Sequence, residues 1–197
     1  VIVSASAVGF YGNRGEEILI ESSDPGKSFL SDVCKQWEKA MTSAINAGIR
    51  VVNARLGMVL SNNGGALKQM LFPYKIGLAG VIGSGKQYMS WVSIDDVTNM
   101  IQHIITNESI RGPVNFVSPN AVSNREFTKT LGRVLHRPTL FNMPAFAARI
   151  SFGEMADNLL LASTRVIPKK LMDSGYEFLY PKLEDAFEHL LKTKNHI

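Results

Sequence analysis

The sequence predicts an α/β fold built on a parallel sheet, and two observations support this prediction. Short runs rich in β-branched residues alternate with longer segments whose apolar residues recur at helical spacing. The runs at residues 1–4 and 49–60 also enclose a long helical segment at residues 28–46. This strand–helix–strand order is typical of the right-handed crossover that joins parallel strands. A chain of 197 residues is long enough for one such domain with a small appended part.

The first strand and helix have clear boundaries. VIVS (residues 1–4) is a β-branched run that suits a strand buried in a parallel sheet. Asp24-Pro25-Gly26 marks a turn in the polar loop that follows. Gly48 ends the helix, whose apolar residues recur at helical spacing: Phe29, Val33, Trp37, Met41 and Ile45. The segment IRVVNARLGMVL (49–60) is the second predicted strand.

The alternation of helices and strands continues to residue 136. The next predicted elements are a helix over 66–77, a strand over 85–94, a helix from Ser93 to Ile105, a strand over 113–118 and a helix over 124–135. Ser93 is the N-cap of its helix, and Ser123 with Glu126 forms a capping box for the last one. Asp95 and Asp96 lie in a first helical turn, where the helix dipole favours acidic side chains, so capping explains this carboxylate pair better than catalysis.

Residues 137–197 differ from the part before them in their sequence pattern. Pro138, Pro144 and Pro168 separate short helical pieces, and an amphipathic helix, LEDAFEHLLK, follows near the end. We therefore predict two parts, with the sheet in residues 1–136 and a small, mainly helical subdomain in residues 137–197.

Composition limits the partners and the compartment. The 21 Lys and Arg residues exceed the 17 Asp and Glu residues only slightly and are scattered, without the basic stripe expected of a nucleic-acid-binding protein. No apolar run is long enough to span a bilayer, and no secretory signal is visible. We therefore expect neither nucleic acid nor a membrane as a partner. A single cysteine, Cys34, suits a reducing compartment, which predicts a cytoplasmic location.

The metal-binding and nucleophilic residue types give no strong site. The four histidines show no metal-ligand spacing, so we predict no metal site. Cys34 lies in the predicted helix at residues 28–46, where a buried small residue is favoured over a reactive thiol because no histidine is near.

The segment GVIGSGKQ (80–87) has nearly the spacing of a phosphate-binding P-loop. Gln87 stands where a hydroxyl would have to bind magnesium, and an extended segment follows where a helix is required. The segment therefore predicts a glycine-rich loop shaped around a ligand or a tight turn.

Several blocks of the sequence carry a resemblance to known proteins: SASAVGFYG (4–12), WEKA (37–40), RLGMVLSNNGGAL (55–67), GSGKQYMSWVSIDDV (83–97) and RGPVNFVSPNAVSNREF (111–127). Together with the tail from His136 they resemble the extended branch of the short-chain dehydrogenase/reductase superfamily. More narrowly, they are similar to the family of NAD(P)-dependent nucleotide-sugar epimerases, whose members have also been called cell-division inhibitors. The resemblance covers nearly the whole chain.

This resemblance implies a fold and a missing part. It implies the C-terminal half of a doubly wound, Rossmann-like parallel sheet with the small, mainly helical C-terminal subdomain. The match begins near the family's fifth strand, and the glycine-rich turn that holds the cofactor pyrophosphate does not occur. We therefore expect a C-terminal fragment that is inactive alone and self-associates through its exposed sheet edge.

The resemblance also implies catalytic positions. In these enzymes a Ser or Thr at the end of the strand binds the substrate oxygen, and a Tyr with a Lys four residues later moves the proton. Ser6 best matches the serine, with close packing at a strand end as the alternative. The Tyr-xxx-Lys pair is missing, because Leu30 and Cys34 stand at its positions and a shift of one residue gives no pair. Tyr11 is the substitute acid/base, or an aromatic residue packed beside the site.

The remaining implied positions concern the cofactor and the substrate. The implied cofactor-binding residues follow the second long strand, where the backbone lies along the nicotinamide of NADP or NAD: Arg55, Gly57 and Leu60. Gly57 permits close approach there, or serves a plain turn. The implied substrate-binding residues are Gly85, Gln87, Ser90, Trp91 and Asn115. Trp91 has burial in the core as its alternative role.

Two function classes remain open. The resemblance implies a full-length NAD(P)-dependent epimerase or reductase whose small-molecule substrate is a nucleotide sugar, with this chain carrying the substrate side of the site. The missing Tyr-xxx-Lys pair favours the alternative, a non-catalytic dinucleotide- or ligand-binding module of the same fold.

Overall fold

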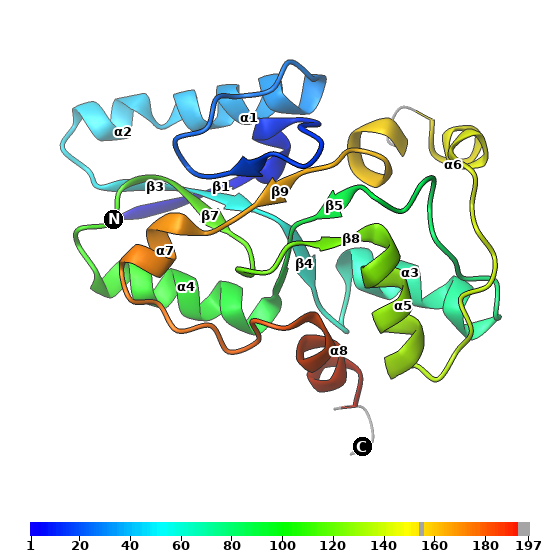
Figure 1. Cartoon of the computed structure of the whole chain (residues 1–197). Coiled ribbons are helices and arrows are strands. Elements are labelled where there is room, and N and C mark those ends of the chain that lie inside the picture. The colour runs from blue at the N-terminus through cyan, green and yellow to red at the C-terminus, as the bar shows by residue number, and fades with distance from the viewer. Residues whose placement is uncertain (154–155, 193–197) are drawn as a thin grey trace.

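The computed structural model describes residues 1–153 and 156–192 and contains the predicted parallel sheet (Figure 1). Its three strands are β1 (Ile2–Ala7), β3 (Val51–Leu56) and β7 (Gly112–Phe116), in the order β1-β3-β7 and parallel throughout. The register places Ser6 beside Arg55 and Arg55 beside Asn115. The prediction of an α/β fold with a parallel sheet is therefore confirmed.

Helices cover the sheet from both sides. Figure 1 shows α1 (Phe29–Ala40) and α2 (Thr42–Asn46) on one face and α4 (Ile94–Thr106) on the other. Serine caps begin the two long helices as their sequences require. The Ser28 side chain accepts the Ser31 N–H at the start of α1, and the Ser93 side chain accepts the Asp96 N–H at the start of α4.

Shorter elements complete the fold. After β1 come the 3₁₀ turn η1 (Val8–Tyr11) and the short strand β2 (Ile18–Leu19). The central part of the chain contains β4 (Met58–Leu60), α3 (Gly65–Lys75), β5 (Tyr88–Met89), β6 (Trp91–Ser93), β8 (Val122–Ser123) and α5 (Asn124–Val134). The last part contains α6 (Ala145–Phe152), the π-helical turn η2 (Ala156–Leu160), β9 (Arg165–Val166), α7 (Lys169–Asp173) and α8 (Leu183–Lys192).

The predicted strand over 85–94 is divided between two sheets. β6 pairs with β4 in parallel, whereas β5 pairs with β8 in antiparallel orientation. The sequence analysis placed β2 in a polar loop, but β2 pairs in parallel with β9 near the other end of the chain. Two-residue strands are too short to show a periodic pattern, so their sequences gave no signal.

Residues of α7 and α8 pack into the same hydrophobic clusters as residues from the first part of the chain. Phe187 of α8 packs with Trp91 and Phe127 in one buried cluster, and Leu171 of α7 packs with Phe116 in another. The two predicted parts, 1–136 and 137–197, thus have core side chains in common, and the division between them stays a prediction.

Helix α1 turns its apolar stripe outward. Phe29 and Trp37 are 75% and 53% exposed, although an apolar stripe at helical spacing normally faces the core. The face of α1 that packs on the sheet carries Ser31, Cys34 and Glu38 instead. Strand β1 beside it is an edge strand of its sheet within the described part of the chain. Self-association through this edge remains a prediction.

Substitution of Gly80 tests the contact between the loop after α3 and the segment around Phe141. A Cβ atom on Gly80 would lie 1.2 Å from the carbonyl oxygen of Phe141, so the two backbones touch there. We expect Gly80→Ala to lower the free energy of unfolding by about 3 kcal/mol, because the two segments must separate. Urea unfolding followed by circular dichroism measures this change.

Gly64→Ala is the matched control for this substitution. Gly64 has an extended backbone, and no atom lies within 4 Å of its added Cβ. Gly64 is the N-cap of α3, where alanine is less favourable than glycine, so we expect Gly64→Ala to lower the free energy of unfolding by no more than about 1 kcal/mol. Equal effects of the two substitutions would show that the contact with Phe141 does not matter.

Candidate functional site

Polar side chains meet at the carboxyl ends of the three parallel strands. Ser6 on β1, Arg55 on β3 and Asn115 on β7 are neighbours in register, and all three are buried. The carboxyl ends of parallel strands are where ligands bind in open α/β sheets. The sheet thus brings one predicted residue of each kind, catalytic, cofactor-binding and substrate-binding, to the same place.

Arg55 and Glu38 form a buried ion pair that also binds Ser6. Nε and Nη2 of Arg55 each donate to one carboxylate oxygen of Glu38 at 2.8 Å. Their side chains are only 4% and 14% exposed. The Ser6 hydroxyl donates to Oε1 of Glu38 at 2.9 Å. Glu38 thereby fixes the direction of the Ser6 proton.

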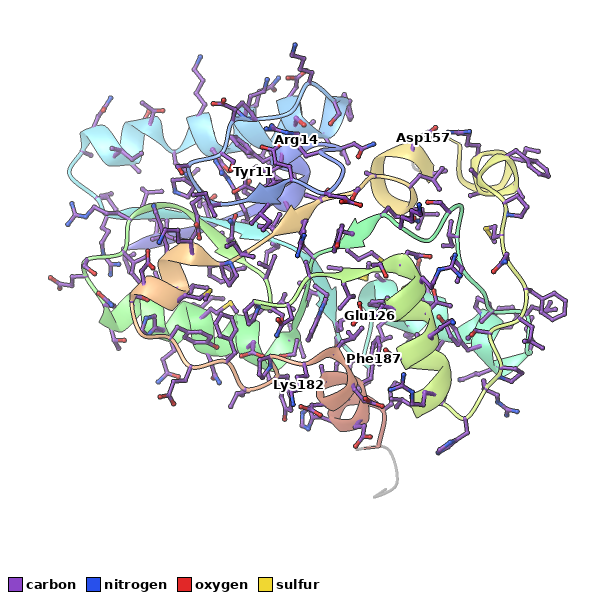
Figure 2. All side chains as sticks on the ribbon, in the orientation of Figure 1. Tyr11, Arg14, Glu126, Asp157, Lys182 and Phe187 are labelled. Carbon is purple, nitrogen blue, oxygen red and sulfur yellow. The ribbon has the colours of Figure 1, made fainter. Side chains whose placement is uncertain are left out.

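Tyr11 continues the network toward β7. Its hydroxyl donates to Oδ1 of Asn115 at 2.7 Å and accepts from Nη1 of Arg55 at 2.9 Å. The guanidinium of Arg55 also lies over the ring of Phe10, 3.5 Å from its centre. Tyr11 is fully buried, and Figure 2 shows its position beneath α1. For Tyr11 to give its proton to a substrate, the hydrogen bond to Asn115 would have to break.

Glu21 links the network to the late part of the chain. Its Oε1 accepts the backbone N–H groups of Asn115 at 3.1 Å and Lys170 at 3.2 Å. The Asn115 side-chain amide donates to the carbonyl of Ile167 at 3.0 Å. The polar groups at the end of β7 are therefore hydrogen-bonded, directly or through Glu21, to Ile167 and Lys170, more than fifty positions later in the sequence.

Burial and charge set the protonation of these groups. Burial raises the pKa of the Tyr11 phenol, and the opposing influence of Arg55 does not offset it. Burial alone would lower the pKa of Arg55, but its hydrogen bonds to Glu38 and Tyr11 raise it above the ordinary value. Burial also raises the pKa of the Cys34 thiol. At neutral pH, Arg55 is charged while the phenol and the thiol keep their protons, so Cys34 is a buried, unreactive residue.

A cavity of about 60 Å³ lies beyond the end of β1. It is lined by Gly9, Gly12, Asn13, Ser28, Leu30, Asp157, Ala162 and Thr164. These residues come from the turn after β1, the start of α1 and the segment around η2, where Figure 2 labels Asp157. Among the described residues that line it, none is Lys or Arg. The cavity therefore suits a neutral polar group better than a phosphate.

Two of the predicted cofactor-binding residues, Gly57 and Leu60, pack against other parts of the protein. A Cβ atom on Gly57 would lie 2.7 Å from the carbonyl oxygen of Ser90, so Gly57 permits the close approach of that backbone. Leu60 is fully buried in the cluster that contains Trp91. Their roles toward a cofactor stay predictions.

The predicted substrate-binding residues other than Asn115 hold segments of the protein together. Gln87 donates its amide to the carbonyls of Ile82 and Leu160, each at 3.0 Å. The Ser90 hydroxyl donates to the carbonyl of Thr164 at 2.7 Å, and it accepts from Val166 N–H.

Trp91 and Gly85 likewise have local partners. Trp91 is fully buried and donates its indole N–H to the carbonyl of Asn120 at 2.9 Å. Gly85 has a φ of +73°, a left-handed conformation that favours glycine, and its N–H donates to the Ile82 carbonyl. The loop continues into strand β5, so the helix that a P-loop requires does not follow. Direct contact of these residues with a substrate remains a prediction.

The sequence analysis missed Glu38 and Glu21 as members of the site. One signal for a carboxylate partner was present, because Arg55 interrupts an otherwise apolar strand and a buried guanidinium needs one. Glu38 also lies one turn after Cys34, on the same face of α1. Glu21 lies in an irregular loop, where no periodic pattern indicates its direction.

The described residues contain no group of three or more His, Cys, Asp or Glu residues that could hold a metal ion. None of the helices in that part of the chain is long and apolar enough to cross a membrane.

Comparison with known proteins identifies the relatives of this chain. Residues 143–190 match the family described as a domain of unknown function, DUF1731. The epimerase family protein MT2273 of Mycobacterium tuberculosis is 42% identical over 185 residues, which cover 94% of this chain and 62% of the relative. The epimerase family protein YfhF of Bacillus subtilis is 39% identical, with 98% and 63% covered.

Solved structures agree with these relatives. Human epimerase family protein SDR39U1, crystallised with NADPH, is 30% identical with a TM-score of 0.89, covering 96% of this chain and 64% of its own. The nucleoside-diphosphate sugar epimerase of Corynebacterium glutamicum is 38% identical with a TM-score of 0.78, covering 96% and 37%. Thermus thermophilus UDP-glucose 4-epimerase, at 17% identity and a TM-score of 0.75, shares the fold.

The parallel sheet and the polar strand ends thus define a Rossmann-like α/β protein of the short-chain dehydrogenase/reductase type. Within that class, the chain is similar over nearly its whole length to the epimerase family proteins MT2273, YfhF and SDR39U1. It spans less than two-thirds of the length of these relatives, from 62% to 64%.

Proposed function

We propose that this chain forms the substrate side of the site in a cytoplasmic, NAD(P)-dependent epimerase or reductase that acts on a nucleotide sugar. The observation that carries the proposal is the position of Ser6. Its hydroxyl lies at the carboxyl end of β1, the strand that leads into the turn lining the cavity. The NADPH in the structure of the human relative supports the choice of cofactor class.

The lining of the cavity fits one end of such a cofactor. The lining contains neutral polar groups: the Ser28 hydroxyl, which pairs with Ser31, and the Thr164 hydroxyl, which donates to the Gly12 carbonyl. Each hydroxyl oxygen can accept a further hydrogen bond. These groups suit a carboxamide or a sugar hydroxyl, and the absence of Lys and Arg from the described lining argues against a pyrophosphate here. NADP and NAD fit equally at this end. When bound, the nicotinamide would accept or donate a hydride.

The residues of this chain would orient the substrate and manage its proton. Because Ser6 donates its proton to Glu38, its oxygen would act as the acceptor toward a substrate hydroxyl. Arg55 holds Glu38 in place, and Tyr11 holds Arg55. The engagement of Tyr11 with Asn115 favours the second candidate, a non-catalytic ligand-binding module of the same fold.

Cofactor titration tests which part of the protein binds the dinucleotide. We expect the 197-residue chain to bind NADPH more weakly than about 1 mM, because the described lining of the cavity contains no Lys or Arg for the phosphates. A protein of the relatives' full length should bind it in the micromolar range. Isothermal titration calorimetry of both proteins measures the difference. Micromolar binding by the shorter chain would overturn the assignment of this part to the substrate side.

A measurement of substrate turnover distinguishes the enzyme hypothesis from that of a non-catalytic binding module. In the full-length protein, NADPH oxidation against a panel of carbonyl compounds should fall by about 100-fold in Ser6→Ala, through loss of a positioned hydroxyl. Ser4→Ala, on the same strand, is the control and should keep its rate. Tight NADPH binding without oxidation of any compound would support the module and reject the enzyme.

A further inference from the structure

Six exposed apolar side chains lie on or next to α3, on the connection after α5 and on α6, outside the candidate site. They are Phe72, Ile76, Leu140, Phe141, Phe146 and Ile150, and together we call them the apolar face. Leu140 and Ile150 are 79% and 81% exposed. Large apolar side chains exposed together mark an interaction surface.

The two segments that carry the apolar face are joined by backbone hydrogen bonds. Met143 N–H donates to the carbonyl of Val81 at 2.9 Å, and Gly83 N–H donates to the carbonyl of Met143 at 2.8 Å. Ala148 is fully buried and anchors α6, whereas Phe146 and Ile150, one turn apart, are exposed. Figure 1 shows α3, the connection after α5 and α6 along one side of the molecule. The fold itself therefore presents these side chains to the solvent.

The same stretches of chain are strongly basic. Residues 61–94 and 127–153 contain seven basic residues and no acidic one, whereas the rest of the chain contains fourteen basic and seventeen acidic residues. The seven are Lys68, Lys75, Lys86, Lys129, Arg133, Arg137 and Arg149, and all are exposed. Arg133 and Arg149 pair with acidic residues from other segments, and the other five form no ion pair among the described residues. These two stretches, which include the segments of the apolar face, thus carry seven exposed positive side chains, which we call the basic surround.

We propose that the apolar face and its basic surround dock on the surface of an anionic phospholipid bilayer. Phe, Leu and Ile side chains enter the boundary between head groups and acyl chains, while Lys and Arg contact the anionic head groups. The sequence analysis expected no membrane partner because it considered only spanning segments. A surface contact needs an exposed face, which only the fold reveals.

Charge and side-chain type disfavour two other occupants. A second copy of this chain would bring two basic surrounds together, and like charges repel. A nucleic-acid strand would match the charge but stacks its bases on aromatic rings, and half of the apolar face is aliphatic: Ile76, Leu140 and Ile150. An anionic bilayer satisfies both the charge and the aliphatic side chains.

Vesicle flotation tests the proposal on the whole chain. We expect it to float with vesicles of phosphatidylcholine containing about one-third phosphatidylglycerol, and not with phosphatidylcholine alone. High salt should release it, because screening weakens the attraction of exposed charges. Phe146→Ser with Ile150→Ser should weaken binding by about tenfold per side chain lost. Both positions are exposed, so circular dichroism should show an unchanged fold.

Phe29→Ser with Trp37→Ser is the matched control, because it removes two exposed apolar side chains from α1 and should leave vesicle binding unchanged. Equal binding to both vesicle types, or equal loss in the two double variants, would overturn the proposal. So would a dimer in solution that the Phe146/Ile150 variant dissociates, without vesicle binding. Absence of binding by a protein of the relatives' full length would show that other residues cover the face, and would also overturn it.

Discussion

Replacing Arg55 with leucine is expected to lower the free energy of unfolding by about 4 kcal/mol, because it leaves the buried Glu38 carboxylate without its partner. Arg55 makes two charged hydrogen bonds to Glu38 and further ones to the Tyr11 hydroxyl and the Glu21 carbonyl. Leucine fills part of the volume but replaces none of these donors. Urea unfolding monitored by circular dichroism measures the loss.

Two further variants test whether the loss of stability in Arg55→Leu comes from the broken ion pair or only from the loss of a side chain. Arg133→Leu removes a guanidinium with the same 2.8 Å contact to a carboxylate, that of Glu184, but the pair is exposed. We expect it to cost about 0.5 kcal/mol. The double variant Arg55→Leu, Glu38→Leu should be more stable than Arg55→Leu, because no unpaired carboxylate remains. A double variant no more stable than the single one would show that the ion pair is not the cause.

Replacing Asp96 with alanine is expected to lower the free energy of unfolding by about 3 kcal/mol, because several buried donors lose their acceptor. The carboxylate accepts from the Ser93 hydroxyl, from the Tyr176 hydroxyl and from the backbone N–H groups of Leu179 and Tyr180. It thereby fastens the chain after α7 to the start of α4. Thermal unfolding and the rate of proteolytic cleavage near residues 176–180 should both report the loss.

The neighbouring residue provides the control. Asp95 lies in the same first turn but is exposed and pairs with His189. Asp95→Ala should cost less than about 1 kcal/mol, which is the range of a helix-dipole contribution and an exposed pair. Accelerated cleavage in both variants to the same extent would mean that the first turn of α4, rather than the Asp96 carboxylate, holds the segment.

Local sequence signals predicted the elements but not the directions of their faces. The caps at Ser93 and Ser123 are where the sequence placed them, because a serine before a helix satisfies a backbone donor without tertiary contacts. The apolar stripe of α1 shows the limit of periodicity. Periodicity locates an apolar face along a helix, but which face meets the sheet depends on partners elsewhere, here Ser6 and Arg55 for Glu38.

For the candidate site, too, the sequence indicated individual residues but not all of their partners. Ser6, Arg55, Tyr11 and Asn115 were singled out separately. The parallel register of three strands brings Ser6, Arg55 and Asn115 together, and the turn η1 after β1 adds Tyr11. Glu38, the shared partner of Ser6 and Arg55, was not predicted, since a glutamate on an amphipathic helix is usually solvated. The hydrogen bonds of Gln87 and Ser90 to residues 160–164 join segments more than seventy positions apart, and no local pattern encodes them.

The pairing of β2 with β9 has a consequence for how the protein is made. Residues 18–19 find their strand partner only at residues 165–166, and the carbonyl of Ile167 completes the surroundings of Asn115. During synthesis, residues 165–167 must therefore emerge from the ribosome before β2 can pair and before the Asn115 side-chain amide meets its acceptor. Until then β2 has an unpaired edge, and unpaired strand edges make a partly folded chain prone to aggregation.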